Sequence, residues 1–247
     1  MASKYNIPIK KSWGQNFLTD DNTINKIIKI INPIKEDTIL EIGPGHGALT
    51  SKLLHLSKKL YVIEIDPLLC KKLKDKYSNL NIVNEDILKW QNNGIDFNKV
   101  VGNIPYNISS QIIFKFLTKE WDIMVLMLQK ELANRIVSNK GSKEYGRISV
   151  MVQNFCDVTY MCDISKNVFY PKPKVDSGIL MFNRKETSLN FDKFSLFIKE
   201  AFKQRRKKLK NNLKEFCNLN YLESHKDQRP EELSPNEYLN LFNKIYF

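Results

Sequence analysis

The sequence predicts an α/β fold: a doubly wound, mostly parallel sheet with an antiparallel closing hairpin, plus a small C-terminal helical domain. Two observations lead to this prediction. Short apolar runs alternate with helical stretches as far as about Val137, and each run stops at a glycine or a polar residue. Those polar and glycine-rich stops all fall where ligands bind in open α/β sheets, beyond the carboxyl ends of the strands.

The elements of the parallel sheet follow in order along the chain. The expected strands are residues 37–42, 60–65, 81–83, 99–103 and 122–128. The expected helices between and after them are residues 48–56, 68–77, 111–117 and 130–137. Each strand is short and apolar, as a strand buried on both faces should be, and the intervening helices imply right-handed crossovers.

The pattern changes beyond about Arg147. Residues 150–160 and 175–182 are expected to be strands of the closing hairpin, since no helix is obvious between them. Between them, residues 168–174 form a loop that Pro171 and Pro173 stiffen. From Asn190 onward the chain is expected to be helical and basic. The sequence therefore predicts two domains, residues 1–184 and residues 185–247.

The chain carries an excess of positive charge. Its 247 residues have a net charge of +12 and a pI of about 9.4, which favours a polyanionic partner. A lysine-rich proteome would give the same excess without such a partner. The basic run Arg205–Lys208 has the same two interpretations, a solvated helix face or a set of contacts with RNA phosphates.

Several classes of protein do not fit the composition. The cysteines Cys70, Cys156, Cys162 and Cys217 form neither a Cys-x-x-Cys pair nor a cluster with histidine, so no metal site is expected. The polar, basic start of the chain does not resemble a signal peptide, and no apolar stretch is long enough to span a membrane. We expect a cytoplasmic protein with reduced thiols.

The glycine-rich turn Gly43–Gly47 follows a strand and opens a helix, as a nucleotide-type cofactor site requires. It matches neither the dinucleotide fingerprint nor a phosphate-binding loop, and its spacing suits S-adenosylmethionine better than a pyrophosphate. Glu64 ends the next strand and is placed to hold ribose hydroxyls, while Asp86 could accept from the adenine amine. Either carboxylate alone could be a solvated loop residue. His46 could contact a ligand or cap the helix.

The segment Asn103-Ile104-Pro105-Tyr106 suits methylation of an exocyclic amine on a planar base. The lone pair of such an amine is delocalised into the ring. The Asn103 side-chain oxygen and a backbone carbonyl near Ile104 or Pro105 could accept its two N–H bonds and direct the lone pair towards a methyl donor. A flat side chain could stack on the extruded base. Asn-x-Pro-Tyr is also an ordinary turn, so the glycine-rich motif upstream is what strengthens this interpretation.

The chain resembles, from end to end, the KsgA-type ribosomal RNA small-subunit adenine N6,N6-dimethyltransferases. The motifs that carry the resemblance are Gly14–Leu18, Glu41–Gly45, Gly47–Thr50, Glu64–Asp66, Asn103–Ser109, Leu128–Glu131, Tyr145–Arg147, Phe169–Ser177 and Phe202–Lys207. The later motifs favour this family over the erythromycin-resistance methylases. The segment 164–168 lacks the prolines common there, and the chain is on the short side.

The resemblance implies a class I, Rossmann-like methyltransferase fold and assigns roles to matching positions. The cofactor-binding residues would be Asn16, Leu18, Gly43, Glu64, Asp86 and Asn103. Asn16 and Leu18 would cover the methionine end of S-adenosylmethionine. The catalytic residues would be Asn103, Pro105, Tyr106 and Phe169, with Tyr106 and Phe169 stacking on opposite sides of the target adenine.

The resemblance also implies the activity: N6 dimethylation of two adjacent adenosines near the 3′ end of small-subunit (16S) rRNA, on a precursor 30S-type particle. The enzyme is expected to be a monomer with no metal and no membrane partner. Two alternatives stay open at this point. One is an erythromycin-resistance type methylase of large-subunit rRNA. The other is a ribosome-assembly factor whose main role is binding.

Overall fold

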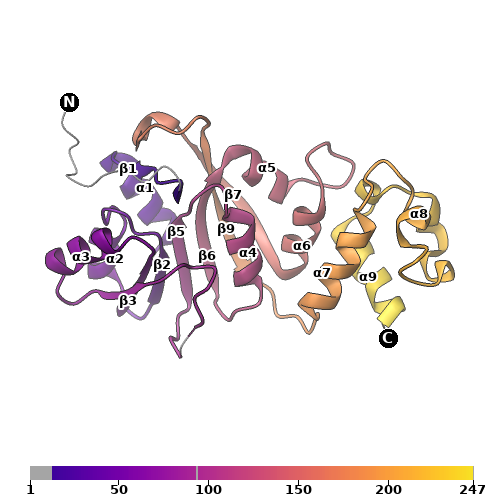
Figure 1. Ribbon diagram of the computed structural model, residues 1–247, viewed down its shortest axis with the longest axis horizontal. Coiled ribbons are helices and arrows are strands. Elements are labelled where there is room, and N and C mark those ends of the chain that lie inside the picture. Colours follow the sequence, from indigo (N-terminus) through magenta and orange to yellow (C-terminus); the bar gives the residue numbers. More distant parts are fainter. Residues whose placement is uncertain (1–12, 93, 247) are drawn as a thin grey trace. The chain divides into compact units, whose positions relative to one another are not determined.

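A computed structural model of the chain describes residues 13–92 and 94–246 (Figure 1). They form two compact units. The first runs to Lys130 and includes Tyr160–Phe182, and the second consists of Glu131–Thr159 and the residues from Asn183 onward. The second unit therefore takes in a segment before the expected domain boundary at residues 184 and 185, and that boundary stays a prediction. The polar start of the chain, expected not to be a signal peptide, falls within residues 1–12, outside the described residues.

Seven strands of the described chain form a mixed sheet in the order β4-β3-β2-β5-β6-β9-β7. Their bounds are β2 Thr38–Ile42, β3 Lys59–Glu64, β4 Asn81–Asn84, β5 Lys99–Asn103, β6 Ile123–Gln129, β7 Cys156–Ile164 and β9 Ser177–Arg184. The strands from β4 to β6 in this order pair in parallel. β9 and β7 lie side by side at the end of the order, where the closing hairpin was expected.

A second, two-stranded sheet joins distant parts of the first unit. β1, Phe17–Leu18, pairs antiparallel with β8, Phe169–Tyr170. The backbone N–H and the hydroxyl of Thr19 both donate to the carbonyl of Val168, at 2.9 and 3.0 Å. The loop expected over residues 168–174 thus contains a short strand that fastens the N-terminal segment.

The helices of the first unit are α1 Asp21–Ile31, α2 Thr50–Leu56, α3 Pro67–Lys76 and α4 Ser109–Leu117. Three of them match expected helices, and α1 was not predicted. Asp20 caps α1 by accepting from the backbone N–H of Thr23 at 2.7 Å. Ile24, Ile27 and Ile31 recur at helical spacing and are buried, so α1 is an amphipathic helix.

The prediction of a strand over residues 150–160 is wrong in its first half. Helix α6 spans Arg147–Phe155, and β7 begins only at Cys156. Gly146 starts the helix by donating its N–H to the Ser149 hydroxyl at 3.1 Å. Seven of the nine residues of α6 are buried, among them the polar Ser149 and Asn154. The β-branched Ile148, Val150 and Val152 favoured a strand over these residues.

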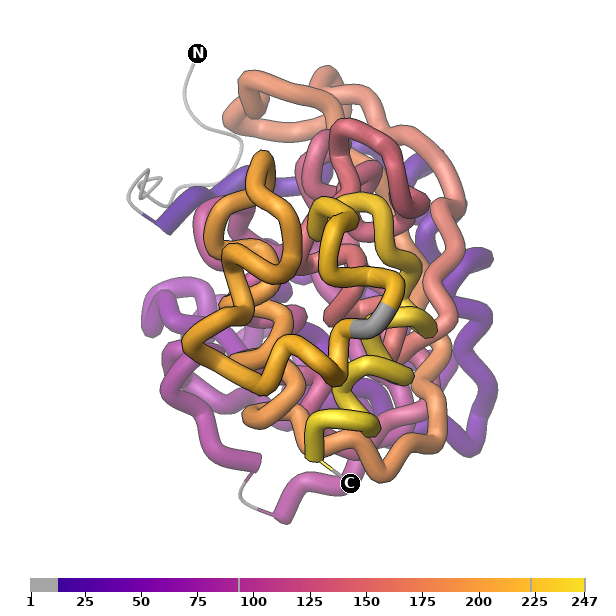
Figure 2. Tube along the Cα trace, turned by 90° about the vertical axis from the view of Figure 1, so that its right-hand side faces the viewer, coloured from indigo at the N-terminus to yellow at the C-terminus, as the bar shows by residue number. Residues whose placement is uncertain are grey.

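The second unit is helical with an aromatic core, and Figure 2 faces its C-terminal part, drawn in orange and yellow. Its helices are α5 Lys130–Val137, α6, α7 Phe191–Ala201, α8 Leu209–Leu213 and α9 Pro235–Tyr246, with 3-10 turns η3 Leu219–Asp227 and η4 Pro230–Glu232. A further 3-10 turn, η2 Lys166–Val168, belongs to the first unit. The rings of Phe194 and Phe242 meet edge to face at 5.2 Å. The Tyr145 hydroxyl is buried and donates to the Leu233 carbonyl at 2.9 Å.

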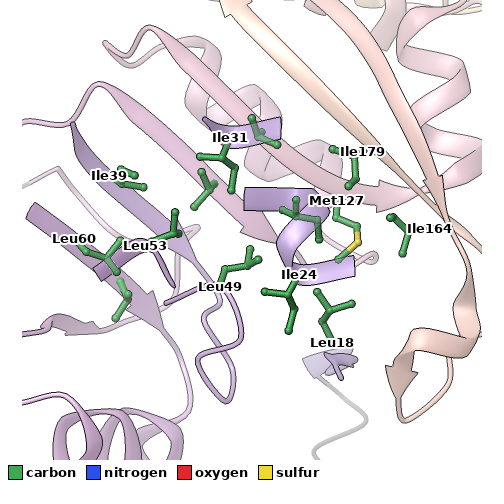
Figure 3. Packing of buried hydrophobic residues seen from close by; sticks show 14 of the residues in the cluster. Leu18, Ile24, Ile31, Ile39, Leu49, Leu53, Leu60, Met127, Ile164 and Ile179 are labelled. Atoms are coloured by element: carbon green, nitrogen blue, oxygen red, sulfur yellow. The ribbon is translucent and has the colours of Figure 1, made fainter. Parts of the chain in front are cut away.

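The core of the first unit packs the helices against the sheet (Figure 3). Its labelled members are Leu18, Ile24, Ile31, Ile39, Leu49, Leu53, Leu60, Met127, Ile164 and Ile179. At the amino ends of β2 and β5, Lys99 Nζ lies 2.7 Å from a buried Asp37 oxygen and also donates to the Asn32 carbonyl at 2.9 Å. This pair fixes one end of the sheet and leaves the carboxyl edge for the site.

All four cysteines are unpaired thiols. None of the described helices has the length and apolar character needed to cross a membrane. Within residues 13–92 and 94–246, histidine, cysteine and carboxylate side chains form no group of three or more that could hold a metal ion.

Candidate active site

A cavity of about 240 Å³ lies in the first unit, at the carboxyl edge of the parallel strands. Four walls come from the segments that follow β2, β3, β4 and β5, and the fifth is the N-terminal segment Trp13–Leu18. Eight predicted site residues line it: Asn16, Leu18, Gly43, Glu64, Asp86, Asn103, Pro105 and Tyr106. The structure therefore brings together all of the predicted site residues except Phe169.

The glycine turn and Glu64 form one hydrogen-bonded unit. Gly43 and Gly45 have φ angles of 66° and 57°, which side chains rarely allow, and the Gly43 N–H donates to the Ile63 carbonyl at 2.9 Å. The Glu64 side chain is only 6% exposed and accepts from the backbone N–H groups of Gly45, at 3.2 Å, and Asp66, at 3.0 Å. Burial raises the pKa of Glu64, and the two N–H donors counteract this. Each carboxylate oxygen keeps capacity to accept from a ligand hydroxyl.

Asp86 lies in the turn after β4, on the same cavity wall as Ile87 and Leu88. Its Oδ1 accepts from the Leu88 N–H at 2.9 Å, which orients the carboxylate. Lys115 of α4 donates to the carbonyls of Leu88, at 3.0 Å, and Trp90, at 2.5 Å, and so holds the turn in place. The turn can present one carboxylate oxygen and two apolar side chains to a planar ring.

The N-terminal segment is attached to the strand ends by specific contacts. The Asn103 side-chain amide donates to the Asn16 carbonyl at 2.8 Å. That bond identifies the nitrogen of the Asn103 amide, so the oxygen is the atom left to accept. No donor to this oxygen occurs within the part of the chain that the structure describes. Asn103 can therefore hold the segment and still present an acceptor to a ligand amine.

Tyr106 follows Pro105 at the cavity wall and is part-buried. Its hydroxyl lies 2.6 Å from the Ser177 hydroxyl at the start of β9. Burial raises the pKa of Tyr106, so the phenol stays protonated at neutral pH. The Pro105 carbonyl accepts from the Ser109 hydroxyl at 2.9 Å and from the Ile108 N–H at 3.3 Å. Pro105 thus closes the turn that carries Tyr106.

Phe169 lies elsewhere. It is 4% exposed and belongs to the apolar core, opposite Leu18 across the β1–β8 pair. It does not line the cavity that holds the other site residues. Its predicted stacking on the adenine stays a prediction, since the side chain is packed in the core in this structure.

Glu41 begins one of the sequence motifs, but the sequence alone predicts no role for it. Glu41 lines the cavity, is 2% exposed and accepts from the Thr50 hydroxyl at 2.6 Å. Burial, with the nearby Glu64 carboxylate, raises the pKa of Glu41 to about 7. A carboxylate at the end of a buried strand next to a glycine turn was the signal that could have identified it.

His46 and Ile65 are two further cavity residues. The His46 ring lies 4.2 Å from that of Phe17, and burial lowers its pKa to about 4, so this imidazole is neutral at pH 7. Ile65 directly follows Glu64 and exposes apolar surface at the cavity wall. An exposed isoleucine beside the Glu64 carboxylate is suited to cover a planar ring.

The basic run Arg205–Lys208 lies in the turn between α7 and α8, where a helix face was expected. Arg205 donates to the carbonyls of Lys143, at 2.6 Å, and Ser142, at 3.0 Å. Lys208 pairs with Asp227 at 3.1 Å. Arg206 and Lys207 are exposed and form no ion pair within the described residues. Arg205 and Lys208 thus bind groups of the protein itself, whereas Arg206 and Lys207 face solvent.

Comparisons with known proteins agree with this arrangement. The profile of the family "Ribosomal RNA adenine dimethylase" matches residues 6–246. A curated relative from Prosthecochloris aestuarii, named ribosomal RNA small subunit methyltransferase A, is 41% identical over 97% of this chain and 95% of its own length. A protein of the same name from Francisella tularensis subsp. novicida is also 41% identical, over 97% of this chain and 98% of its own length.

Solved structures give the same result for the fold. A dimethyladenosine transferase from Plasmodium falciparum is 33% identical, with a TM-score of 0.83 over 92% of this chain and 98% of that chain. The 23S rRNA methyltransferase ErmE is 27% identical, with a TM-score of 0.71 over 93% of this chain and 99% of that chain. The predicted class I methyltransferase fold is confirmed.

The raised pKa of Glu41 predicts a pH dependence of stability. The folded state holds this proton more tightly than the unfolded chain, so the contribution of Glu41 is fully present below 4.5 and is lost as the pH rises through about 7. Glu41→Gln stays neutral and keeps an acceptor for Thr50. Between these pH values, the free energy of unfolding should fall more for the unsubstituted protein than for Glu41→Gln. Urea titrations measure it, and parallel pH curves for the two proteins would contradict the assignment.

Proposed function

The chain belongs to the ribosomal RNA adenine dimethylase family, and from this premise we propose that it transfers methyl groups from S-adenosylmethionine to adenine N6 in small-subunit (16S) rRNA. The targets are two adjacent adenosines near the 3′ end. The observation that carries the proposal is the Asn103 amide. Its nitrogen is bound to the Asn16 carbonyl, and its oxygen is available in the same cavity as Glu64 and Tyr106.

The cavity fits S-adenosylmethionine. Glu64 can accept from both ribose hydroxyls, Asp86 can accept from the adenine amine, and Ile65 and Ile87 offer apolar surface for the ring. Asn16 and Leu18 lie on the wall formed by the N-terminal segment. When bound, the cofactor supplies an electrophilic methyl group on a sulfonium. The protein supplies proximity and orientation, which can lower the activation barrier by several kcal/mol.

Two acceptors orient the target amine. The Asn103 side-chain oxygen accepts one N–H bond, and a backbone carbonyl accepts the other. The Pro105 carbonyl already accepts from Ser109 and Ile108, whereas no donor reaches the Ile104 carbonyl within the described residues. We therefore assign the second acceptor to Ile104. With both N–H bonds engaged, the nitrogen lone pair points away from the acceptors, and the proton leaves after the amine has become cationic.

Tyr106 stacks on the target adenine in this proposal. Its bond with Ser177 fixes the plane of the ring before the base arrives, which lowers the entropic cost of stacking. Phe169 would have to leave the core to stack on the opposite side.

The partner proposed for the basic surface is rRNA within a precursor 30S-type particle. The net charge of +12 and the solvent-facing Arg206 and Lys207 suit phosphate contacts. We propose that the enzyme acts in the cytoplasm, as a monomer.

Mapping N6-methylated adenosines tests the proposed function against its alternatives. Unmethylated small subunits and large-subunit rRNA are each incubated with the protein and S-adenosylmethionine. Dimethylation of two adjacent adenosines in the small subunit alone supports the proposal. Methylation of large-subunit rRNA alone would support the erythromycin-resistance alternative. Tight binding of small subunits without methyl transfer would support the assembly-factor alternative.

Glu64→Ala should weaken S-adenosylmethionine binding by at least tenfold. Charge-assisted hydrogen bonds to the ribose are worth about 1.5–3 kcal/mol each. Glu64→Gln, which keeps one acceptor oxygen, should lose less. Isothermal calorimetry measures both, with circular dichroism as the control for folding. If Glu64→Ala bound S-adenosylmethionine as tightly as the unsubstituted protein does, Glu64 would not be a cofactor-binding residue.

Tyr106→Ala should slow methyl transfer by roughly ten- to a hundredfold, since stacking is worth about 1–3 kcal/mol per base. S-adenosylmethionine affinity should stay nearly unchanged. A loosened adenine should leave after one transfer more often, so mass spectrometry of the rRNA should show accumulated monomethyladenosine. Tyr106→Phe and Ser177→Ala, which only break the hydroxyl pair, should keep most activity. If Tyr106→Phe is as inactive as Tyr106→Ala, stacking is not the main role of Tyr106.

Neutralising Arg206 and Lys207 should weaken RNA binding across sequences and flatten its salt dependence by roughly one unit of slope per phosphate contact. Arg205→Gln is the contrasting variant, because Arg205 bonds the carbonyls of Ser142 and Lys143 and should mainly lower stability. Filter binding at several salt concentrations measures the slope. An unchanged slope in the Arg206 and Lys207 double variant would indicate that these residues are solvated and do not contact RNA phosphates.

A further inference from the structure

The β1–β8 pair has two chemically different faces. In an antiparallel pair, residues directly opposite each other project to the same side, and neighbours along a strand project to opposite sides. Leu18 is opposite Phe169, and both are buried in the core. Phe17 is opposite Tyr170, and Phe17 and Leu18 both line the cavity. Tyr170 therefore projects to the same side of the pair as Phe17, away from the side on which Leu18 and Phe169 enter the core.

Tyr170 differs from Phe169 in exposure. Its side chain is 45% exposed, against 4% for Phe169. The aromatic ring that this loop offers to a ligand in the described structure is thus Tyr170, one residue away from the one that the family motif suggested. Tyr170 does not line the cofactor cavity, but Phe17, which it pairs with across β1 and β8, does. Tyr170 is therefore next to a residue of the cavity wall.

Two lysines follow Tyr170 closely in the chain. Lys172 and Lys174 are exposed and form no ion pair within the described residues. Val175, 44% exposed, adds apolar surface to the same loop. An exposed aromatic ring next to unpaired lysines is the combination with which proteins bind single-stranded nucleic acid, because the ring stacks on a base and the lysines contact the backbone.

The loop is also held in place before any ligand binds. The Asp176 carboxylate accepts from the Lys166 N–H at 2.9 Å, and the Asp176 carbonyl accepts from the Lys130 N–H at 3.0 Å. At the other end, Thr19 donates twice to the Val168 carbonyl. A loop ordered in advance loses little entropy when it binds, which is what a stacking platform requires.

We propose that Tyr170 is a second stacking platform, which holds the base of a nucleotide next to the target adenosine while Lys172 and Lys174 contact the flanking phosphates. The inference rests on the proposed function, since it assigns a place to RNA outside the cavity. A neighbouring base held at Tyr170 keeps the strand at the site while the target base is turned into the cavity. It gives this loop a role in RNA binding that does not require Phe169 to leave the core.

The test uses a short single-stranded oligoribonucleotide with two adjacent adenosines and 2-aminopurine at each flanking position in turn. Stacking on an aromatic ring quenches 2-aminopurine. With 2-aminopurine at one of the two flanking positions, the unsubstituted protein and Tyr170→Phe should quench its fluorescence. Tyr170→Ala should not. Tyr221→Ala is the matched control, since Tyr221 is 44% exposed and lies in η3. It should leave the quenching intact.

A kinetic arm uses unmethylated small subunits. Tyr170→Ala should raise KM by about ten- to a hundredfold, the range for one lost stacking contact, with unchanged S-adenosylmethionine affinity. Lys172→Gln with Lys174→Gln should lower the salt slope of oligonucleotide binding by roughly 0.7 per contact. The same change at Lys71 and Lys74, exposed lysines of α3, should not.

Three results would overturn the platform. If Tyr170→Ala and Tyr221→Ala gave the same quenching and the same KM, Tyr170 would not be part of the RNA site. A Tyr170 that binds a protein instead of RNA would give this result. A matching loss of S-adenosylmethionine affinity in Tyr170→Ala would show that it only supports β1. Quenching that persists in Tyr170→Ala would place the base elsewhere. Failure of the proposed function is seen separately, as absence of methyl transfer by the unsubstituted protein, and leaves the quenching result to decide on the platform.

Discussion

The register of the parallel strands is the constraint on which the site depends. Ile42 pairs with Ile63 on one side and with Gly102 on the other, so the residues that follow, Gly43, Glu64 and Asn103, emerge along one edge. Gly102 enforces this closeness, since a Cβ there would lie 2.8 Å from the Ile42 carbonyl oxygen. A shift of one residue would turn each side chain to the opposite face and disperse the site. The cofactor residues and the amine acceptors are therefore consequences of one pairing.

Asn103 links the two halves of the chemistry. By donating to the Asn16 carbonyl it attaches the N-terminal segment to the strand end, and the same bond orients its own oxygen, which we propose as the acceptor for the target amine. The segment is held a second time where β1 pairs with β8, whose loop carries Tyr170. The N-terminal segment, the Asn103 amide and the loop that carries Tyr170 thus form one hydrogen-bonded chain of contacts within the first unit.

Local patterns predicted what depends on local sequence. Strand β5 and helix α5 were predicted at the bounds that the structure has, because each is a short run with clear stops. Helix α1 carried both a cap at Asp20 and a helical period, so it could have been found. Helix α6 was missed, because Val150 and Val152 favour a strand and no side-chain cap marks its start at Gly146. The choice between Phe169 and Tyr170 depends on which face of a two-residue strand meets the core, and only the pairing with β1 decides that.

The residues that line the cavity also favour one kind of cofactor over another. Its charged side chains include the carboxylates of Glu41, Glu64 and Asp86, and the pKa values of Glu41 and Glu64 are raised by burial. None of the described residues that line the cavity is a lysine or arginine that could pair with a pyrophosphate, whereas the carboxylates can accept from the hydroxyl and amine groups of adenosine. In the proposed mechanism the methylated amine is cationic before it loses its proton, so the Asn103 oxygen and the Ile104 carbonyl would stabilise it more strongly than the neutral amine. In the proposed function, an acidic cavity in a protein of net charge +12 separates two tasks: the basic surface would attract RNA, and the cavity would receive only the uncharged base.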